Sequence, residues 1–174
     1  MRRMFLSLCA LIAVSAPVSA QEFASTTIDL GVVVSNLEKS AEFYTKVVGF
    51  KEVDGFSVPG DFAKEAGLTD GQPLKIRVFV LGEGASATKL KLMELPQTKP
   101  APTNTQFIHS QVGFRYLTIA VADAKVALDR LEKNGVKTVS KGALPLPKGL
   151  PQDLTLTVFR DPDGNIIEFV GPKK

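Results

Sequence analysis

The chain has 174 residues, 44% of them hydrophobic and 22% charged, with a formal net charge of +3. This composition suits one globular domain with a real core, and it excludes a disordered or collagen-like chain. The sequence has no basic patch interleaved with aromatic residues, so nucleic acid is not an expected partner.

The N-terminus has the organisation of an export signal. Arg2 and Arg3 precede an apolar run, residues 4–14, and small residues follow at 18–20. These features predict that residues 1–20 are a signal peptide and that the mature chain lies in the periplasm or outside the cell. The run is too short to span a bilayer and no second run of about 20 apolar residues follows, so no membrane span is expected after cleavage.

The first half of the mature chain predicts a strand, a helix and further strands. Residues 28–34 are rich in β-branched side chains and alternate between two faces. Ser35 and Glu38 form the predicted capping box of a helix that ends at Gly49. The two later segments that alternate as strands are residues 75–81 and 89–93.

The second half repeats this order of elements. Asp123 is the predicted N-cap of a helix that Gly135 terminates. The Asp-Pro-Asp-Gly sequence at 161–164 predicts a turn, because proline presets φ and glycine accepts a positive φ. The segments that alternate as strands in this half are residues 116–121, 154–159 and 166–170.

The repeated order predicts an α+β fold. We expect two tandem βαβββ modules that form a cupped antiparallel sheet around a cavity, with the helices on the outer face. Residues 21–174 are expected to form this single domain. Within it, module one is predicted at about 26–96, a linker rich in Pro, Thr and Gln at about 97–111, and module two at about 112–171.

Strand alternation also predicts which side chains line the cavity. Basic residues outnumber acidic ones on the face away from the helices, which favours an anionic or aromatic-acid ligand, although a merely solvated sheet face alternates in the same way. The residues assigned to this face are Asp29, Lys75, Arg77, Phe79, Lys89, Lys91, Met93, Tyr116, Thr118, Thr155, Thr157 and Glu168.

Two segments carry a family resemblance. Residues 34–44 with Val48-Gly49-Phe50, and residues 159–169 with Asp-Pro-Asp-Gly-Asn and a final Ile-Glu-Phe, resemble the first and last parts of the vicinal oxygen chelate superfamily. That superfamily contains glyoxalases, bleomycin resistance proteins and extradiol dioxygenases. The resemblance covers residues 26–171 and implies the fold described above, but members differ in function, so it does not fix an activity.

The resemblance implies four metal-ligand positions, of which this chain keeps one expected residue, Glu168. The other three fall on Asp29, Lys91 and Tyr116, where the family usually has His or Gln, Glu, and His. A lysine ammonium adds a positive charge and has no free lone pair. No cofactor is therefore expected. Lys91 is expected to replace the metal and to pair with Asp29 and Glu168, while Tyr116 hydrogen-bonds to the group; a divalent metal is the weaker alternative.

The sequence leaves three functions open. The first is an exported, metal-free protein that binds a small organic and possibly anionic ligand through Asp29, Arg77, Lys91, Tyr116 and Glu168. The alternative is a glyoxalase-type lyase or isomerase in which Glu168 is the catalytic base, with or without a divalent metal. In the third, the proline-rich segment 143–151 docks a protein partner, although the same segment would also serve as a lid. A homodimer is left open.

Overall fold

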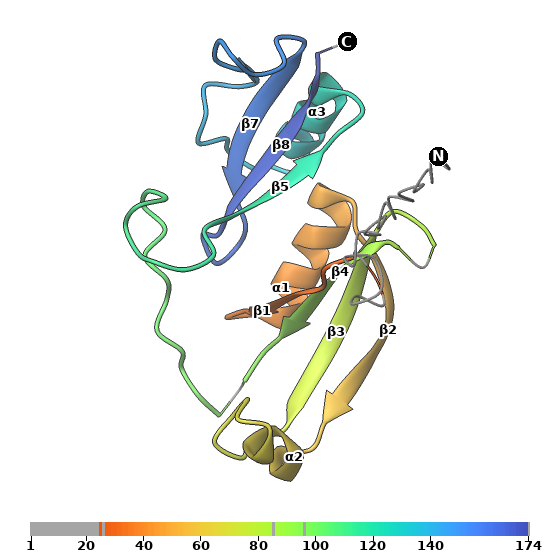
Figure 1. Cartoon of the computed structure of the whole chain (residues 1–174), viewed down its shortest axis with the longest axis vertical. Helices are drawn as coiled ribbons and strands as arrows, with labels where there is room; N and C mark the ends of the chain where they lie inside the picture. The colour runs from red at the N-terminus through yellow and green to blue at the C-terminus, as the bar shows by residue number, and fades with distance from the viewer. Residues whose placement is uncertain (1–24, 26, 85, 96, 174) are drawn as a thin grey trace, which may run out of the picture.

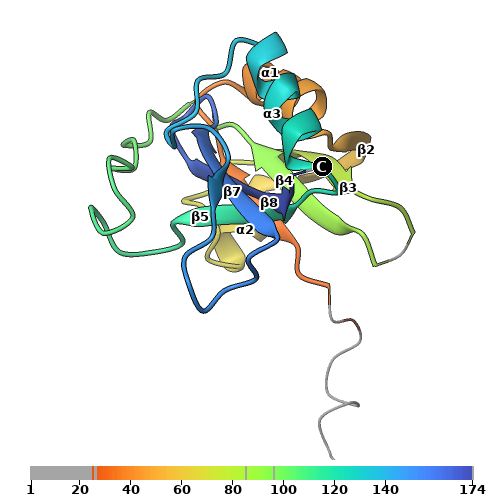
Figure 2. The ribbon, with the colours of Figure 1, turned by 90° about the horizontal axis from the view of Figure 1, so that it is seen from above.

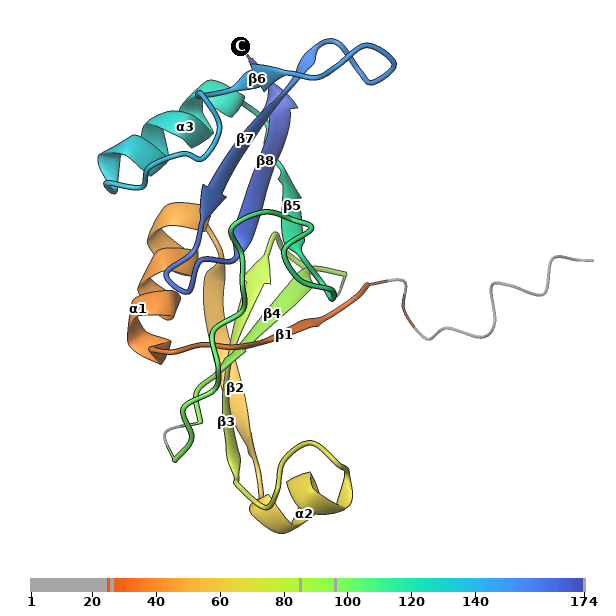
Figure 3. The same ribbon diagram turned by 90° about the vertical axis from the view of Figure 1, so that its left-hand side faces the viewer.

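The computed structural model describes residues 25, 27–84, 86–95 and 97–173. Two four-stranded sheets lie end to end, with their main helices on the same side (Figure 1; Figure 3). The predicted signal peptide, residues 1–20, lies outside the described residues. Within those residues, no helix has both the length and the apolar character needed to cross a membrane.

Module one forms a sheet in the order β1-β4-β3-β2. It contains a short helix, α2, that the sequence analysis did not predict. Its elements are β1 (Leu30–Val33), α1 (Leu37–Glu42), the π-helix η2 (Phe43–Val48), β2 (Lys51–Val58), α2 (Gly60–Glu65), β3 (Leu74–Leu81) and β4 (Thr88–Met93).

Module two repeats the arrangement in the order β5-β8-β7-β6. Its elements are β5 (Tyr116–Ala120), α3 (Ala124–Lys133), β6 (Leu144–Pro145), β7 (Leu154–Arg160) and β8 (Ile166–Pro172). The α+β fold with two βαβββ modules is therefore confirmed.

The strand pairing corrects one detail of the expected sheet. Pairing is antiparallel among β2, β3 and β4 and among β6, β7 and β8, as predicted. The first strand of each module instead joins the last in parallel, β1 with β4 and β5 with β8. The reason is topological. Each first strand is followed by a helix and not by a tight turn, so its partner is the last strand of the module, which runs in the same direction.

The start of α1 differs from the predicted capping box. Asn36 is the N-cap, and its side chain accepts a hydrogen bond of 2.8 Å from the backbone N–H of Lys39. Ser35 instead donates its backbone N–H to the carboxylate of Asp163, and Glu38 pairs with Arg77. The capping box is wrong because Asn36, one residue later, is the N-cap, and because the Glu38 side chain pairs with Arg77.

The end of this helix is a π-helix. The backbone N–H groups of Gly49 and Phe50 both donate to the carbonyl oxygen of Tyr44. Gly49 has a φ of +101°, so the predicted glycine stop is confirmed. The wider turn places Phe43, Tyr44, Val47 and Val48 in the core.

One apolar core joins the two modules. Leu90 and Leu92 of β4 and Phe159 and Phe169 of module two belong to the same buried cluster. The ring of Phe43 lies 6.3 Å from that of Phe159, centroid to centroid. The two modules therefore share one apolar core.

A buried hydrogen bond fixes the module-two turn against module one. Asp161 accepts hydrogen bonds from the hydroxyl of Tyr44 at 2.9 Å and from the backbone N–H groups of Asp163 and Asn165. Gly164, with a φ of +86°, donates its N–H to the Asp161 carbonyl, so the predicted turn is confirmed. Burial, aided by the charge of Asp161, raises the pKa of the Tyr44 hydroxyl far above its usual range, so this group remains a donor.

Removing the Tyr44 hydroxyl should destabilise the protein. In Tyr44→Phe, the buried Asp161 carboxylate loses one donor, and we expect the free energy of unfolding in urea to fall by about 1.5–3 kcal/mol. Tyr116 is the other tyrosine of the chain and is exposed, so Tyr116→Phe is the matched control and should change stability by less than about 0.5 kcal/mol. Equal effects of the two substitutions would contradict the role assigned to this bond.

Candidate functional site

The candidate site lies on the sheet face away from α1 and α3, here called the open face. In β4, Leu90 and Leu92 are buried in the shared core on the helix side. Strand alternation therefore places Lys89, Lys91 and Met93 on the open face.

The predicted side-chain directions are wrong in two equivalent strands, β3 and β7. In β3, Arg77 and Phe79 pair with Leu92 and Leu90 and so lie on the helix side. In β7, Thr155 and Thr157 are on the helix side, on the same face as Phe159. All four residues had been assigned to the cavity, as had Lys75, which alternation places on the same face of β3 as Arg77.

The error has a physical cause. The open face of module one has its own apolar cluster, formed by Leu74, Ile76 and Val78 with Val58, Met93 and Leu95 packed against it. In β3 the open face is apolar and the helix side carries Lys75 and Arg77 beside Phe79, so the alternating pattern alone assigns the wrong face to the helix.

Lys91 and Asp29 form the ion pair expected from the sequence. Their Nζ and Oδ2 atoms are 2.8 Å apart, and the side chains are 30% and 35% exposed. The hydrogen bond from Lys91 is the main cause that lowers the pKa of Asp29. The Lys91 ammonium also lies 6.0 Å from the ring centroid of Phe56 on β2.

Glu168 lies in module two and has a different partner. Its Oε2 atom accepts a hydrogen bond of 2.7 Å from the hydroxyl of Thr118, which is opposite it in the β5–β8 ladder. Tyr116 is on the same face of β5 as Thr118 and is exposed. In the described chain, no ion pair joins Lys91 to Glu168, and the Tyr116 hydroxyl makes no hydrogen bond to either. Of the contacts expected among these four residues, the structure contains the Lys91–Asp29 pair alone within the described chain.

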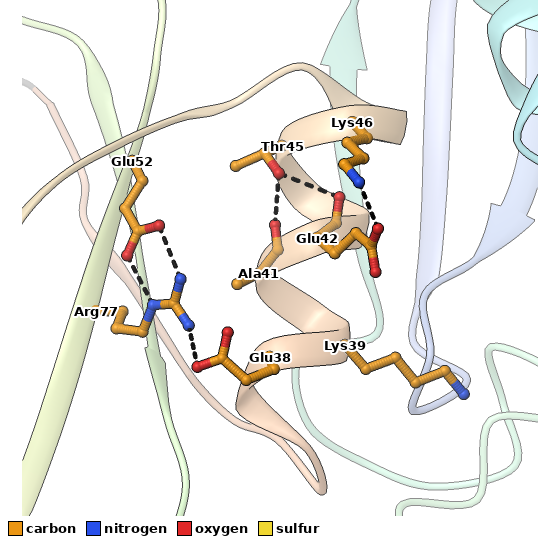
Figure 4. Close-up of a pocket in the computed structure, with 8 residues that line it drawn as sticks. All are labelled: Glu38, Lys39, Ala41, Glu42, Thr45, Lys46, Glu52 and Arg77. Atoms are coloured by element: carbon orange, nitrogen blue, oxygen red, sulfur yellow. Dashed lines mark hydrogen bonds and ion pairs between the residues drawn. The ribbon is translucent and has the colours of Figure 1, made fainter.

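Arg77 is separated from Lys91 by the sheet. Its guanidinium pairs with Glu52 at 2.6 Å and with Glu38 at 2.8 Å (Figure 4). These carboxylates, Glu52 foremost, raise the pKa of Arg77 further above its usual range. The three side chains border an open hollow of about 470 Å³ between α1 and the sheet. The predicted grouping of Arg77 with the other site residues is therefore wrong.

The proline-rich segment 143–151 does not cover the Lys91 pair. It contains β6 and lies at the end of module two that faces away from β4 (Figure 3). The side-chain amide of Gln152 donates to the carbonyl oxygens of Pro147 and Leu150, which holds the segment in a compact loop. The lid interpretation is not supported.

The donor set at the four family positions does not fit a divalent metal. Lys91 brings a positive charge to one position, and its ammonium already neutralises the carboxylate of Asp29. Among the residues that the structure describes, no three His, Cys, Asp or Glu side chains are grouped as a metal site. Of the four family positions, Glu168 alone has a carboxylate that is not in an ion pair in the described chain.

Comparison with known families decides the relationship. The family model for the Glyoxalase/Bleomycin resistance protein/Dioxygenase superfamily matches residues 26–169. The chain belongs to this superfamily. No curated protein sequence matches the chain.

Solved structures share the superfamily fold. A glyoxalase family protein from Bacillus cereus is 18% identical, with a TM-score of 0.70 over 91% of this chain and 100% of that one. A glyoxylase/bleomycin resistance protein/dioxygenase domain from Frankia sp. EAN1pec is 18% identical, with a TM-score of 0.61 over 86% and 93% of the two chains. A mutant glyoxalase I from Zea mays is 18% identical, with a TM-score of 0.63, and the match covers 85% of this chain and 45% of that one.

Phe56 is a neighbour of Lys91 that was not predicted from the sequence. Phe56 belongs to β2, an exposed edge strand that was not predicted, and the register of β2 shifts between Val53 and Phe56. A bulge at that point interrupts the two-residue alternation by which strands are recognised. The available signal was Gly55, because a glycine inside a strand often marks a bulge.

Replacing Lys91 should raise the pKa of Asp29. In Lys91→Met the carboxylate loses its hydrogen-bond donor, so a carboxyl carbon NMR titration should show its pKa returning toward the usual value. Because the folded pKa is depressed, the pair stabilises the fold above the unfolded-state pKa and loses this effect as the pH falls through the folded-state pKa. Lys89→Met is the control, since Lys89 acts on Asp29 only through its charge. An unchanged Asp29 titration in Lys91→Met would contradict the pair.

Proposed function

We propose that the protein is exported, loses residues 1–20 and binds a small organic acid on the open face of module one without a metal ion. The observation that carries this proposal is the Lys91–Asp29 pair, at positions where family enzymes usually hold metal ligands. Its ammonium is held 2.8 Å from the carboxylate and is still partly exposed to solvent.

Lys91 can receive a ligand carboxylate while it remains paired with Asp29. An ammonium group has three N–H donors, and the pair with Asp29 leaves donors free. Lys89 adds a second positive charge on the same face of β4. The ring of Phe56 and the apolar cluster that includes Met93 supply a wall for an apolar ligand body. The expected ligand is a carboxylate with an aromatic or branched apolar body.

Binding of simple aromatic acids tests the proposal. With benzoate and phenylacetate as probes, amide NMR shifts should move in β1, β2 and β4, and Lys91→Met should weaken binding at least about tenfold. Arg77→Met removes the same charge from the opposite side of the sheet, so it should leave the affinity unchanged. The proposal fails if neither acid moves the amide NMR signals of these strands, or if Lys91→Met binds the acids as tightly as the unchanged chain.

Glu168 supports a second candidate, a metal-free or metal-dependent lyase or isomerase. The Thr118 hydroxyl fixes one carboxylate oxygen at 2.7 Å. The other oxygen could then accept a proton from a substrate carbon next to a carbonyl group, as a general base does. This candidate rests on a single positioned carboxylate, whereas the binding proposal rests on an ion pair with an apolar wall.

Metal retention separates the binding proposal from the metal-dependent form of the enzyme. After incubation with nickel, zinc, manganese or iron(II) and desalting, we expect the full chain to keep far less than one equivalent of each, because Lys91 repels a dication. Lys91→Glu should retain more metal, since Asp29 then lacks its ammonium partner. One equivalent in the unchanged chain, lost in Glu168→Gln, would overturn the metal-free proposal and favour the enzyme.

A further inference from the structure

The loop before β5 exposes a group of large apolar side chains. Phe107 and Ile108 are each 55% exposed, and Val112 and Phe114 are exposed almost completely or completely. The loop projects away from both sheets (Figure 1; Figure 2). Single exposed apolar residues are ordinary, but four within the eight residues 107–114 are a local concentration, which indicates a contact with something else.

Hydrogen bonds hold the backbone of this loop in place. The guanidinium of Arg115 donates to the carbonyl oxygens of Asn104 at 2.6 Å and Ile108 at 3.0 Å. Arg160 of β7 donates to the carbonyl oxygen of Gln106 at 3.1 Å. A loop fixed in this way loses little backbone entropy when its side chains are bound.

The charge along the loop and its flanks has one sign. The chain has 18 acidic residues, but none lies between Leu95 and Ala122, where Lys99 and Arg115 are the charged side chains. A positively charged surface is attracted to anionic phospholipid headgroups, and this segment has no carboxylate that would repel them.

The shape of the loop also favours a bilayer over a protein partner. Val112 and Phe114 flank Gly113, which has a φ of +117°, so both side chains leave a sharp turn into solvent. A protein partner would need a hollow that matches this tip, whereas the interfacial region of a bilayer accepts apolar side chains without a preformed pocket.

We propose that residues 107–114 insert into the interfacial region of a bilayer containing anionic phospholipids, so that the protein docks on a membrane surface. Phe107, Ile108, Val112 and Phe114 enter the region of the acyl chains, and Arg115 lies at the level of the headgroups. This contact is separate from the ligand proposed for Lys91.

A tryptophan reporter tests insertion of the loop directly. The chain has no tryptophan, so Phe114→Trp gives a single fluorophore at the tip, and Val126→Trp gives a matched one at an exposed position of α3. With vesicles of equal parts phosphatidylcholine and phosphatidylglycerol, emission from position 114 should shift to shorter wavelength and be quenched by brominated lipid. Emission from position 126 should not change. No shift at position 114 would overturn the proposal.

Vesicle co-sedimentation of the full chain provides the second test. The double variant Val112→Ser/Phe114→Ser should bind the vesicles at least about tenfold more weakly than the unchanged chain, because it removes apolar surface that insertion would transfer out of water. Val126→Ser should bind like the unchanged chain. All three chains keep the apolar N-terminal run, so they differ only at the substituted positions.

Two results would overturn the proposal. One is equal co-sedimentation of the double variant and the unchanged chain. The other is self-association by light scattering that the double variant abolishes while position 114 shows no lipid-dependent shift, which would assign the loop to a contact between two copies.

Discussion

The buried hydrogen bond between Tyr44 and Asp161 is the contact on which the arrangement of the two modules depends. Asp161 opens the turn between β7 and β8, and Tyr44 lies in η2 of module one. The bond therefore fixes the start of β8, and with it Glu168, relative to the helix of the other module. A carboxylate buried without its donors would be costly, so the turn and the helix cannot separate without loss of stability.

The open face of module one carries a chemistry that differs from that of a metal enzyme of the same superfamily. An ammonium at Lys91 is a hydrogen-bond donor with a fixed charge, whereas a metal ion binds ligand oxygens through vacant coordination positions. Asp29 orients that ammonium and lowers its net electrostatic effect. The binding proposal therefore relies on hydrogen bonds from this ammonium to an anion, and the superfamily fold itself imposes no activity on the site.

Local signals predicted the fold better than the site. Gly49 and the turn at 161–164 act through their own backbone, and Asp123 accepts hydrogen bonds from the backbone N–H groups of Lys125 and Val126, so the sequence alone located all three. The directions of Arg77 and Thr157 depend on which sheet face meets a helix, and that is decided by packing between distant segments. The Lys91–Asp29 pair was predictable because the family resemblance aligned both positions, while the Thr118–Glu168 bond required the register of β5 against β8.

The parallel joining of β1 to β4 and of β5 to β8 also governs how the chain folds. Leu30 pairs with Leu90, and Tyr116 with Ile166, so neither first strand has a partner until the last strand of its module is available. Contacts so distant in sequence make loop closure costly and folding slow. Since the core also needs Phe159 and Phe169, a chain interrupted before module two would leave the apolar side of α1 and β4 exposed. Folding is thus delayed until nearly the whole chain is present.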